Sequence, residues 1–99
     1  MKNTLAAALM AVLLVPVAQA AGPADAFQAK CAACHGKDGK GQTAMAQKLG
    51  VKDLTVTKLS ATDIGKVITS GKGKMTPFKG KLSDAEIGEL AKYVAGGMK

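Results

Sequence analysis

The sequence contains no tryptophan and no arginine, and its only aromatic residues are Phe27, Phe78 and Tyr93. The net charge of +7 comes from fourteen lysines against seven acidic residues, so nucleic acid has to be considered as a partner. Proteins that bind single-stranded nucleic acid stack its bases on aromatic side chains along a basic groove. Because no such aromatic-rich basic stripe is present, the composition argues against nucleic acid binding.

No apolar run in the chain reaches the roughly 20 residues that a membrane-spanning helix needs. The apolar run from Leu5 to Val15 follows a lysine and is succeeded by the small-residue triplet Ala-Gln-Ala, which ends at Ala20. This order of features is typical of a secretory signal peptide. We therefore predict a signal peptide at residues 1–20, cleavage after Ala20, export to the periplasm and no stable membrane insertion of the mature chain.

Removal of residues 1–20 leaves 79 residues, enough for one small domain at 21–99 and no second one. A domain near this size buries only about 60% of its unfolded surface, and natural examples often add a disulfide, a metal or another cross-link. With so few aromatic side chains, the mature chain can build only a small hydrophobic core. The sequence thus predicts that a cofactor contributes to its stability.

Helical periodicity dominates the mature chain. Ser60 is a capping residue with an acid in the following turn, and Ser83 with Glu86 forms a capping box. Glycines mark the helix ends and the loop at 36–41. The strand-like piece at 54–57 has no evident partner, so we expect an all-α fold. The predicted helices are 23–35, 43–49, 60–70 and 83–95.

The segment Cys31-Ala32-Ala33-Cys34-His35 matches the Cys-x-x-Cys-His pattern of covalent haem attachment. Two thiols three residues apart on one helical face can each add to one of the two vinyl groups at a porphyrin edge. The next residue then brings its imidazole to the iron. The sequence therefore predicts one haem c, held through thioethers by Cys31 and Cys34 and ligated by His35.

Three other interpretations of these residues are weaker. A thioredoxin-like dithiol would accompany a longer chain with βαβ patterning, which is absent. A structural zinc site needs four ligands, and the motif supplies three with no second pair elsewhere. A disulfide between Cys31 and Cys34 would close so small a loop that it would stabilise the fold little.

The mature chain resembles the small monohaem class I cytochromes c of the bacterial periplasm. The resemblance rests on CAACHGKDGKG, on Phe27 four residues before the first cysteine, on the segment 71–78 and on the final helix ending in LAKYV. It implies a cytochrome c fold of three to four short helices around one haem, in which the first and last helices cross and Phe27 packs near Tyr93. It also implies that a methionine before a proline-containing loop is the sixth iron ligand.

We predict that Met75 is this ligand, because it lies in a glycine-rich, proline-containing loop between two predicted helices. Met45 falls on the apolar face of a short helix, and Met98 in a terminus that we expect to fray. The alternative for Met75 is ordinary filling of a gap in the core.

Several members of the family carry a proline after the attachment motif whose carbonyl orients the ligating histidine, and this sequence has none between His35 and Met75. We expect another backbone carbonyl of the loop to accept the imidazole N–H, since ligating histidines nearly always have such a partner. We further expect Ile68, Phe78 and Leu82 to bury the haem.

Ligation by His35 and Met75 would fill both axial positions, prevent oxygen or peroxide from binding and favour reduced iron. The predicted function is a soluble, monomeric single-electron carrier of the periplasm, and not an enzyme. A haem enzyme or gas-binding protein with an open sixth position is the contrasting class.

Positions 72–81 carry several lysines and no acidic residue. Such a positive collar around the haem edge would steer the protein to acidic patches on a reductase or an oxidase. A solvated loop in a basic protein is the alternative. The lysines are Lys72, Lys74, Lys79 and Lys81.

Overall fold

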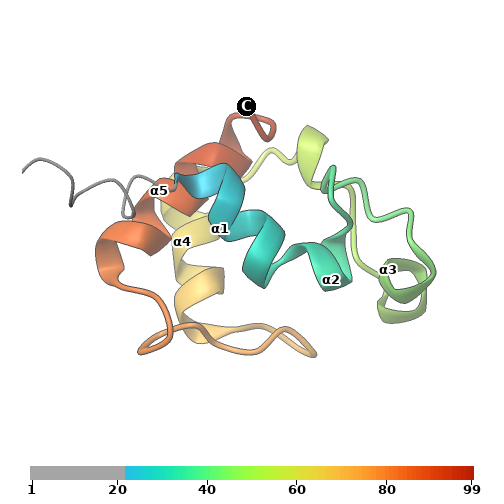
Figure 1. Ribbon diagram of the computed structural model, residues 1–99, viewed down its shortest axis with the longest axis horizontal. Helices are drawn as coiled ribbons and strands as arrows, with labels where there is room; N and C mark the ends of the chain where they lie inside the picture. Colours follow the sequence, from blue (N-terminus) through green and yellow to red (C-terminus); the bar gives the residue numbers. More distant parts are fainter. Residues whose placement is uncertain (1–21) are drawn as a thin grey trace, which may run out of the picture.

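The computed structural model describes residues 22–99, so the signal peptide predicted at 1–20 lies outside the described residues. Residues 22–99 fold into five α-helices and one short 3-10 helix, and they form no strand (Figure 1). This confirms the all-α prediction. None of the helices at 22–99 is long and apolar enough to cross a membrane. The elements are α1 (Pro23–Lys30), α2 (Ala32–His35), α3 (Ala44–Leu49), η2 (Leu54–Val56), α4 (Ala61–Ser70) and α5 (Asp84–Ala95).

The predicted helix at 23–35 is two helices, because the backbone leaves the helical region at Cys31, where φ is −120° and ψ is −29°. The N–H of Cys31 still donates to Phe27 O at 2.8 Å, which ends α1. The Cys31 carbonyl then accepts from His35 N at 3.0 Å, which begins α2. The Cys-x-x-Cys-His motif therefore starts at the N-cap of a short helix of its own.

The caps of the later helices agree with the sequence patterns. Thr43 Oγ1 accepts from Ala46 N at 3.0 Å at the start of α3. Ser60 opens α4 and Ser83 opens α5, each in a complete capping box. The strand-like piece at 54–57 is the 3-10 helix η2. Two of the N–H groups that a strand would offer to a neighbour are bonded locally instead, Thr55 N to Asp53 Oδ1 and Thr57 N to Leu54 O, which favours a helical turn.

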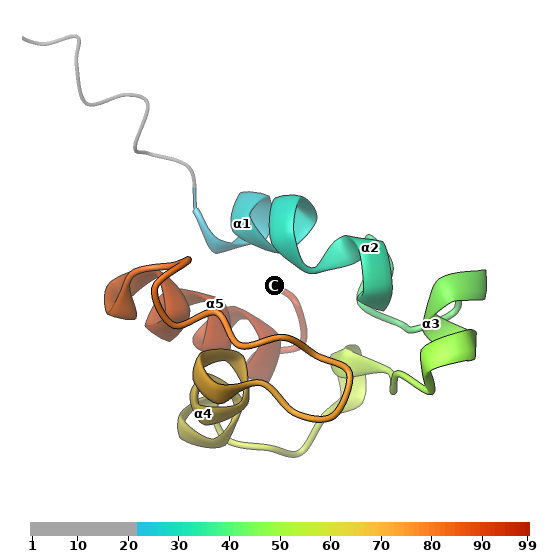
Figure 2. The ribbon, with the colours of Figure 1, turned by 90° about the horizontal axis from the view of Figure 1, so that it is seen from below.

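The core lies between α4, α5 and α1. Figure 2 shows α1 and α2 on one side of α5 and α4 on the other, while α3 lies at the far end of the molecule in both views. Phe27 on α1 is only 1% exposed, and its ring centroid lies 6.3 Å from that of Tyr93 on α5. This contact confirms the expected packing of the first and last helices. The buried core residues are Phe27, Ile64, Ile68, Leu82, Ile87, Leu90, Ala91 and Val94.

Candidate functional site

A cavity of about 590 Å³ opens between α2, the segment after α3 and the loop after α4. Cys31, Cys34 and His35 line it from the attachment motif, and Met75 lines it from the distant loop. Its volume falls within the roughly 300–1,000 Å³ of sites that hold small molecules and cofactors. Folding thus brings all four residues named by the sequence to one place.

The two cysteines of the motif differ in exposure, and both thiols are free. Cys31 is half-buried and Cys34 is exposed. Burial, and secondarily the charge of Cys34, raises the pKa of the Cys31 thiol to about 11. Thiol-disulfide exchange needs an attacking thiolate, and burial disfavours that form at Cys31.

The His35 imidazole is half-buried in the cavity wall, and burial lowers its pKa below the usual value. The neutral form, which can donate a lone pair to a metal, is therefore favoured near pH 7. Nδ1 is buried and has no hydrogen-bond partner among the described residues. No carbonyl at 22–99 accepts a hydrogen bond from this ring, contrary to our expectation.

Three carbonyls of the loop after His35 accept hydrogen bonds from other donors. Gly36 O accepts from Gly39 N at 3.0 Å, and Gly39 O accepts from Leu54 N at 2.8 Å. Lys37 O accepts from Gln28 Nε2 at 2.7 Å. These bonds organise the loop itself instead of the imidazole.

A tight turn places Met75 at the cavity. Lys72 N donates to Met75 O at 3.0 Å, and Met75 N donates to Lys72 O at 2.9 Å. The turn requires Gly71, which has φ of +77° and whose Cβ would lie 2.6 Å from Met75 O and 2.8 Å from Pro77 N. The other end of the loop is anchored where Phe78 N donates to Ile68 O at 2.9 Å.

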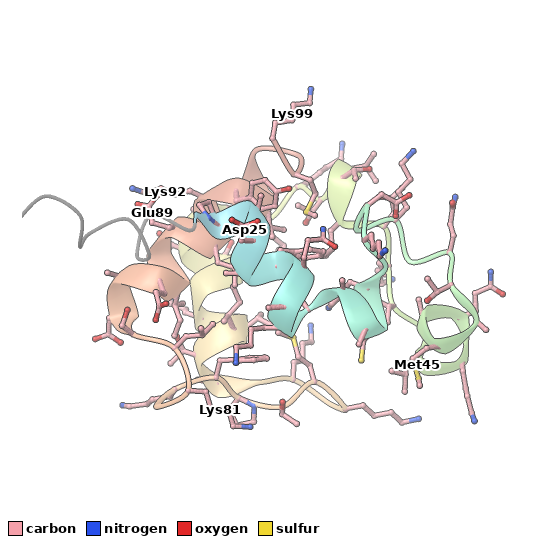
Figure 3. All side chains as sticks on the ribbon, in the orientation of Figure 1. Asp25, Met45, Lys81, Glu89, Lys92 and Lys99 are labelled. Atoms are coloured by element: carbon pink, nitrogen blue, oxygen red, sulfur yellow. The ribbon has the colours of Figure 1, made fainter. Side chains whose placement is uncertain are left out.

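Of the three methionines at 22–99, only Met75 lines the cavity. Met45 is 49% exposed on α3, away from the core helices (Figure 3). Met98 does not fray as we expected, because its N–H donates to Tyr93 O at 2.9 Å and its side chain packs over Gly39. The prediction for Met98 was therefore wrong.

The lysines at the cavity only partly match the predicted collar. Lys72 and Lys74 line the cavity, joined by Lys30 and Lys52, whereas Lys79 and Lys81 do not. Lys81 instead lies on the loop below α4, with Nζ 5.9 Å from the Phe78 ring centroid (Figure 3). Lys30 directly precedes Cys31, so its place at the cavity could have been inferred from the motif. The sequence carries no local signal for Lys52.

The apolar wall of the cavity also differs from the expectation. Phe78 lines it as predicted, but Ile68 and Leu82 belong to the buried core. Val67, the neighbour of Ile68 on α4, lines the cavity instead. Leu49, the last residue of α3, and Val51, just after that helix, line it as well. These positions depend on how the segments pack and have no motif of their own.

The residues present fit a covalently bound haem. Two free thiols, a neutral imidazole and a thioether converge on one mainly apolar cavity, and the imidazole and thioether form a donor pair that haem iron accepts in electron-transfer proteins. The thiols come from one helical turn, and the thioether comes from a separate segment.

Residues 18–94 match the family model described as cytochrome c oxidase, cbb3-type, subunit III. The chain is 44% identical over 78 residues to cytochrome c6 of Leptolyngbya boryana, covering 78% of this chain and 91% of that protein. It is 38% identical over 78 residues to cytochrome c6 of Anabaena variabilis, covering 71% and 81%. The solved structure of the KustC0563 c-type cytochrome superposes with a TM-score of 0.70 at 30% identity, over 80% of this chain and 100% of that one.

A further match is the cbb3-type oxidase subunit FixP of Azorhizobium caulinodans, 40% identical over 76 residues. That match covers 72% of this chain but only 25% of FixP. The same domain therefore also occurs as a part of larger proteins.

Proposed function

Because the chain belongs to the small monohaem class I c-type cytochromes, which are electron carriers and not enzymes, we propose that its haem c is attached at Cys31 and Cys34. In this proposal His35 and Met75 are the two axial ligands. The observation that carries it is that these four side chains, from two separate segments, line one cavity.

The haem supplies a one-electron ferrous/ferric couple when bound. The residues of the chain determine how that couple is used. Burial favours the neutral form of the His35 imidazole. The turn at Gly71, in the loop after α4, places the Met75 thioether at the cavity. With His35 and Met75 both holding the iron, no position on it would stay open to oxygen, as expected of a carrier and not of an oxygen-binding protein.

Apolar side chains around the cavity support the same function. Val67, Phe78 and Leu49 line it, and a wall of low polarity disfavours the additional charge of ferric iron. This raises the reduction potential above that of a solvent-exposed haem with the same ligands. The chain would then accept electrons from donors of low potential and pass them to stronger oxidants.

The carrier works between reductase and oxidase partners, and we propose that it meets them through acidic patches as a monomer. Four exposed lysines from three parts of the chain line the cavity that would hold the haem. A cationic rim at the point of electron exchange raises the rate of encounter with an anionic surface. The lysines are Lys30, Lys52, Lys72 and Lys74.

We also propose that the carrier is soluble in the periplasm after loss of residues 1–20. The support is the order of a positive residue, a short apolar run and the small-residue triplet ending at Ala20. Export is consistent with the proposal that Cys31 and Cys34 bind a covalent cofactor and form no disulfide with each other.

The proposal is tested on the protein purified from a periplasmic fraction, by intact mass and by a pyridine haemochrome spectrum. We expect the mass of residues 21–99 plus one haem, and the spectrum of a haem with both vinyl groups saturated. Cys31→Ala and Cys34→Ala should each shift the spectrum to that of a haem with one vinyl group. A mass equal to the bare polypeptide, or complete extraction of the pigment by acid acetone, would contradict covalent attachment.

A further inference from the structure

The C-terminal end of the chain packs on the loop that follows His35. An added Cβ on Gly39 would lie 3.0 Å from Met98 Cε and 3.1 Å from Met98 Sδ, so the side chain lies directly on the loop backbone. Gly39 is buried and has φ of +72°. Glycine at this position therefore serves both the loop conformation and the close approach of Met98.

The backbone of Met98 itself has φ of +72°, and at 22–99 no other non-glycine residue has a positive φ. Residues with side chains rarely adopt this conformation, and they retain it where surrounding contacts over-determine it. Here the contacts are the hydrogen bond from Met98 N to Tyr93 O and the packing on Gly39. The end of the chain is thus held in a specific place.

Two further contacts hold the same loop. Gln28 of α1 donates to Lys37 O at 2.7 Å, and Leu54 N donates to Gly39 O at 2.8 Å. The loop in turn holds the backbone of the motif, because Gly41 N donates to His35 O at 3.0 Å. Met98 is the contact that joins this loop to α5.

We propose that Met98 is a positioning residue for the His35 imidazole, acting through the loop at 36–41. The proposal rests on ligation of the haem iron by His35. A ligating histidine is normally oriented by a hydrogen bond from its second ring nitrogen, but Nδ1 of His35 has no such partner. The orientation of the ring then depends on packing and on the backbone to which it is attached.

Packing on the ring itself comes from Phe27, whose centroid lies 6.3 Å from that of His35. Packing on the backbone comes from the loop that Met98 covers. Loss of the Met98 side chain leaves Gly39 uncovered and removes the contact that joins the loop to the C-terminal segment, so the loop is held less firmly. The ring would follow, because no hydrogen bond at Nδ1 fixes its orientation.

The test compares Met98→Ala with Met98→Leu in the holoprotein. The ferric protein reports the orientation of the ligand through the paramagnetically shifted NMR signals of the His35 ring, and the reduction potential reports its effect on the iron. We expect Met98→Ala to change both, and to speed hydrogen exchange of the Leu54 amide about tenfold. Met98→Leu keeps a side chain of similar volume, so the His35 signals, the reduction potential and the Leu54 exchange rate should stay as in the wild type. Met45→Ala, at an exposed position, is the matched control and should change none.

A purely structural role would lower stability and speed exchange at Leu54 while leaving the His35 signals and the potential as in the wild type, which would overturn the proposal. If Met98→Ala gives no holoprotein, Met98→Val removes only the outer part of the side chain and serves the same comparison. If the wild type shows no shifted His35 signals, the ligation itself is wrong, and that failure belongs to the proposed function.

Discussion

The rings of Phe27 and His35 lie with their centroids 6.3 Å apart and their planes inclined at 47°. Phe27 also lies 6.3 Å from Tyr93, so one buried ring contacts both the last helix and the proposed ligand. The hydrophobic core and the site thus share this side chain. Stability and ligand geometry should respond together when it is changed.

Phe27→Ala should lower the free energy of unfolding by about 3–5 kcal/mol, because it leaves a cavity where a fully buried ring packed. Denaturant unfolding of the ferric holoprotein measures this loss. Leu59→Ala is the control, since Leu59 is 51% exposed and its loss should change stability by no more than about 0.5 kcal/mol. Similar losses for both variants would contradict the packing described for Phe27.

Met75→Ala should abolish the sulfur-to-iron charge-transfer band of the ferric protein and allow carbon monoxide to bind the ferrous form. The reason is that Met75 alone among the methionines at 22–99 lines the cavity. Absorption spectroscopy measures both effects, with Met45→Ala as the control that retains the band. Ready binding of carbon monoxide by the wild type would show that the sixth position is open.

Gly71→Ala should displace the turn that carries Met75, because its new Cβ would meet Met75 O at 2.6 Å in addition to the strain of a positive φ. We expect weakening of the charge-transfer band together with loss of stability. Gly73→Ala is matched to it, since φ is +57° there and nothing lies within 4 Å of a Cβ. That variant should cost about 1–2 kcal/mol and leave the band intact. An intact band in both variants would mean that the Gly71 turn does not place Met75.

The lysines at the cavity should make electron exchange depend on ionic strength in opposite senses for anionic and cationic reagents. The rate constant with ferricyanide should fall as salt is added, and that with hexaammineruthenium should rise. The double variant of Lys72→Gln and Lys74→Gln should slow the reaction with ferricyanide severalfold at low salt.

The control for that experiment makes the same change in net charge away from the site. Lys58 and Lys99 are exposed and do not line the cavity. Changing both to glutamine should have a smaller effect on the rate. Equal effects of the two double variants would mean that net charge alone, and not a collar at the cavity, governs the reaction.

The capping box of α5 should make stability depend on pH on the acid side. Ser83 N donates to Glu86 Oε1 at 2.8 Å, and this bond is the main cause of the lowered pKa of the Glu86 carboxyl. The carboxylate therefore stabilises the fold above the unfolded pKa of about 4.3, and this contribution is lost as the pH falls through the lower folded pKa.

Glu86→Gln should accordingly destabilise the protein at pH 6 more than at pH 3, as measured by denaturant unfolding at each pH. Glu89→Gln should have little effect at either pH, because its ion pair with Lys92 at 3.6 Å is exposed. A loss for Glu86→Gln that is the same at both values would exclude ionisation of Glu86 as the cause.

The local elements of this fold could be predicted because each depends on neighbours within a few residues. The capping boxes at Ser60 and Ser83 form bonds three positions along the chain, and the spacing in CAACH sets the cysteines and histidine on one turn. The break at Cys31 could not be predicted, because the apolar spacing is the same for one helix as for two.

Tertiary structure decided what lies across from the motif. The cavity takes Lys52, Val67 and Met75 from segments whose mutual distance depends on packing of whole helices. The sequence predicted that a carbonyl of the loop would accept from His35, but two of the loop carbonyls accept from donors on α1 and η2. The sequence by itself determined the helices, the attachment motif and the family resemblance, since all are local patterns. Only the folded chain decided which side chains surround the site and that Met98 closes its loop, since those contacts join residues far apart in sequence.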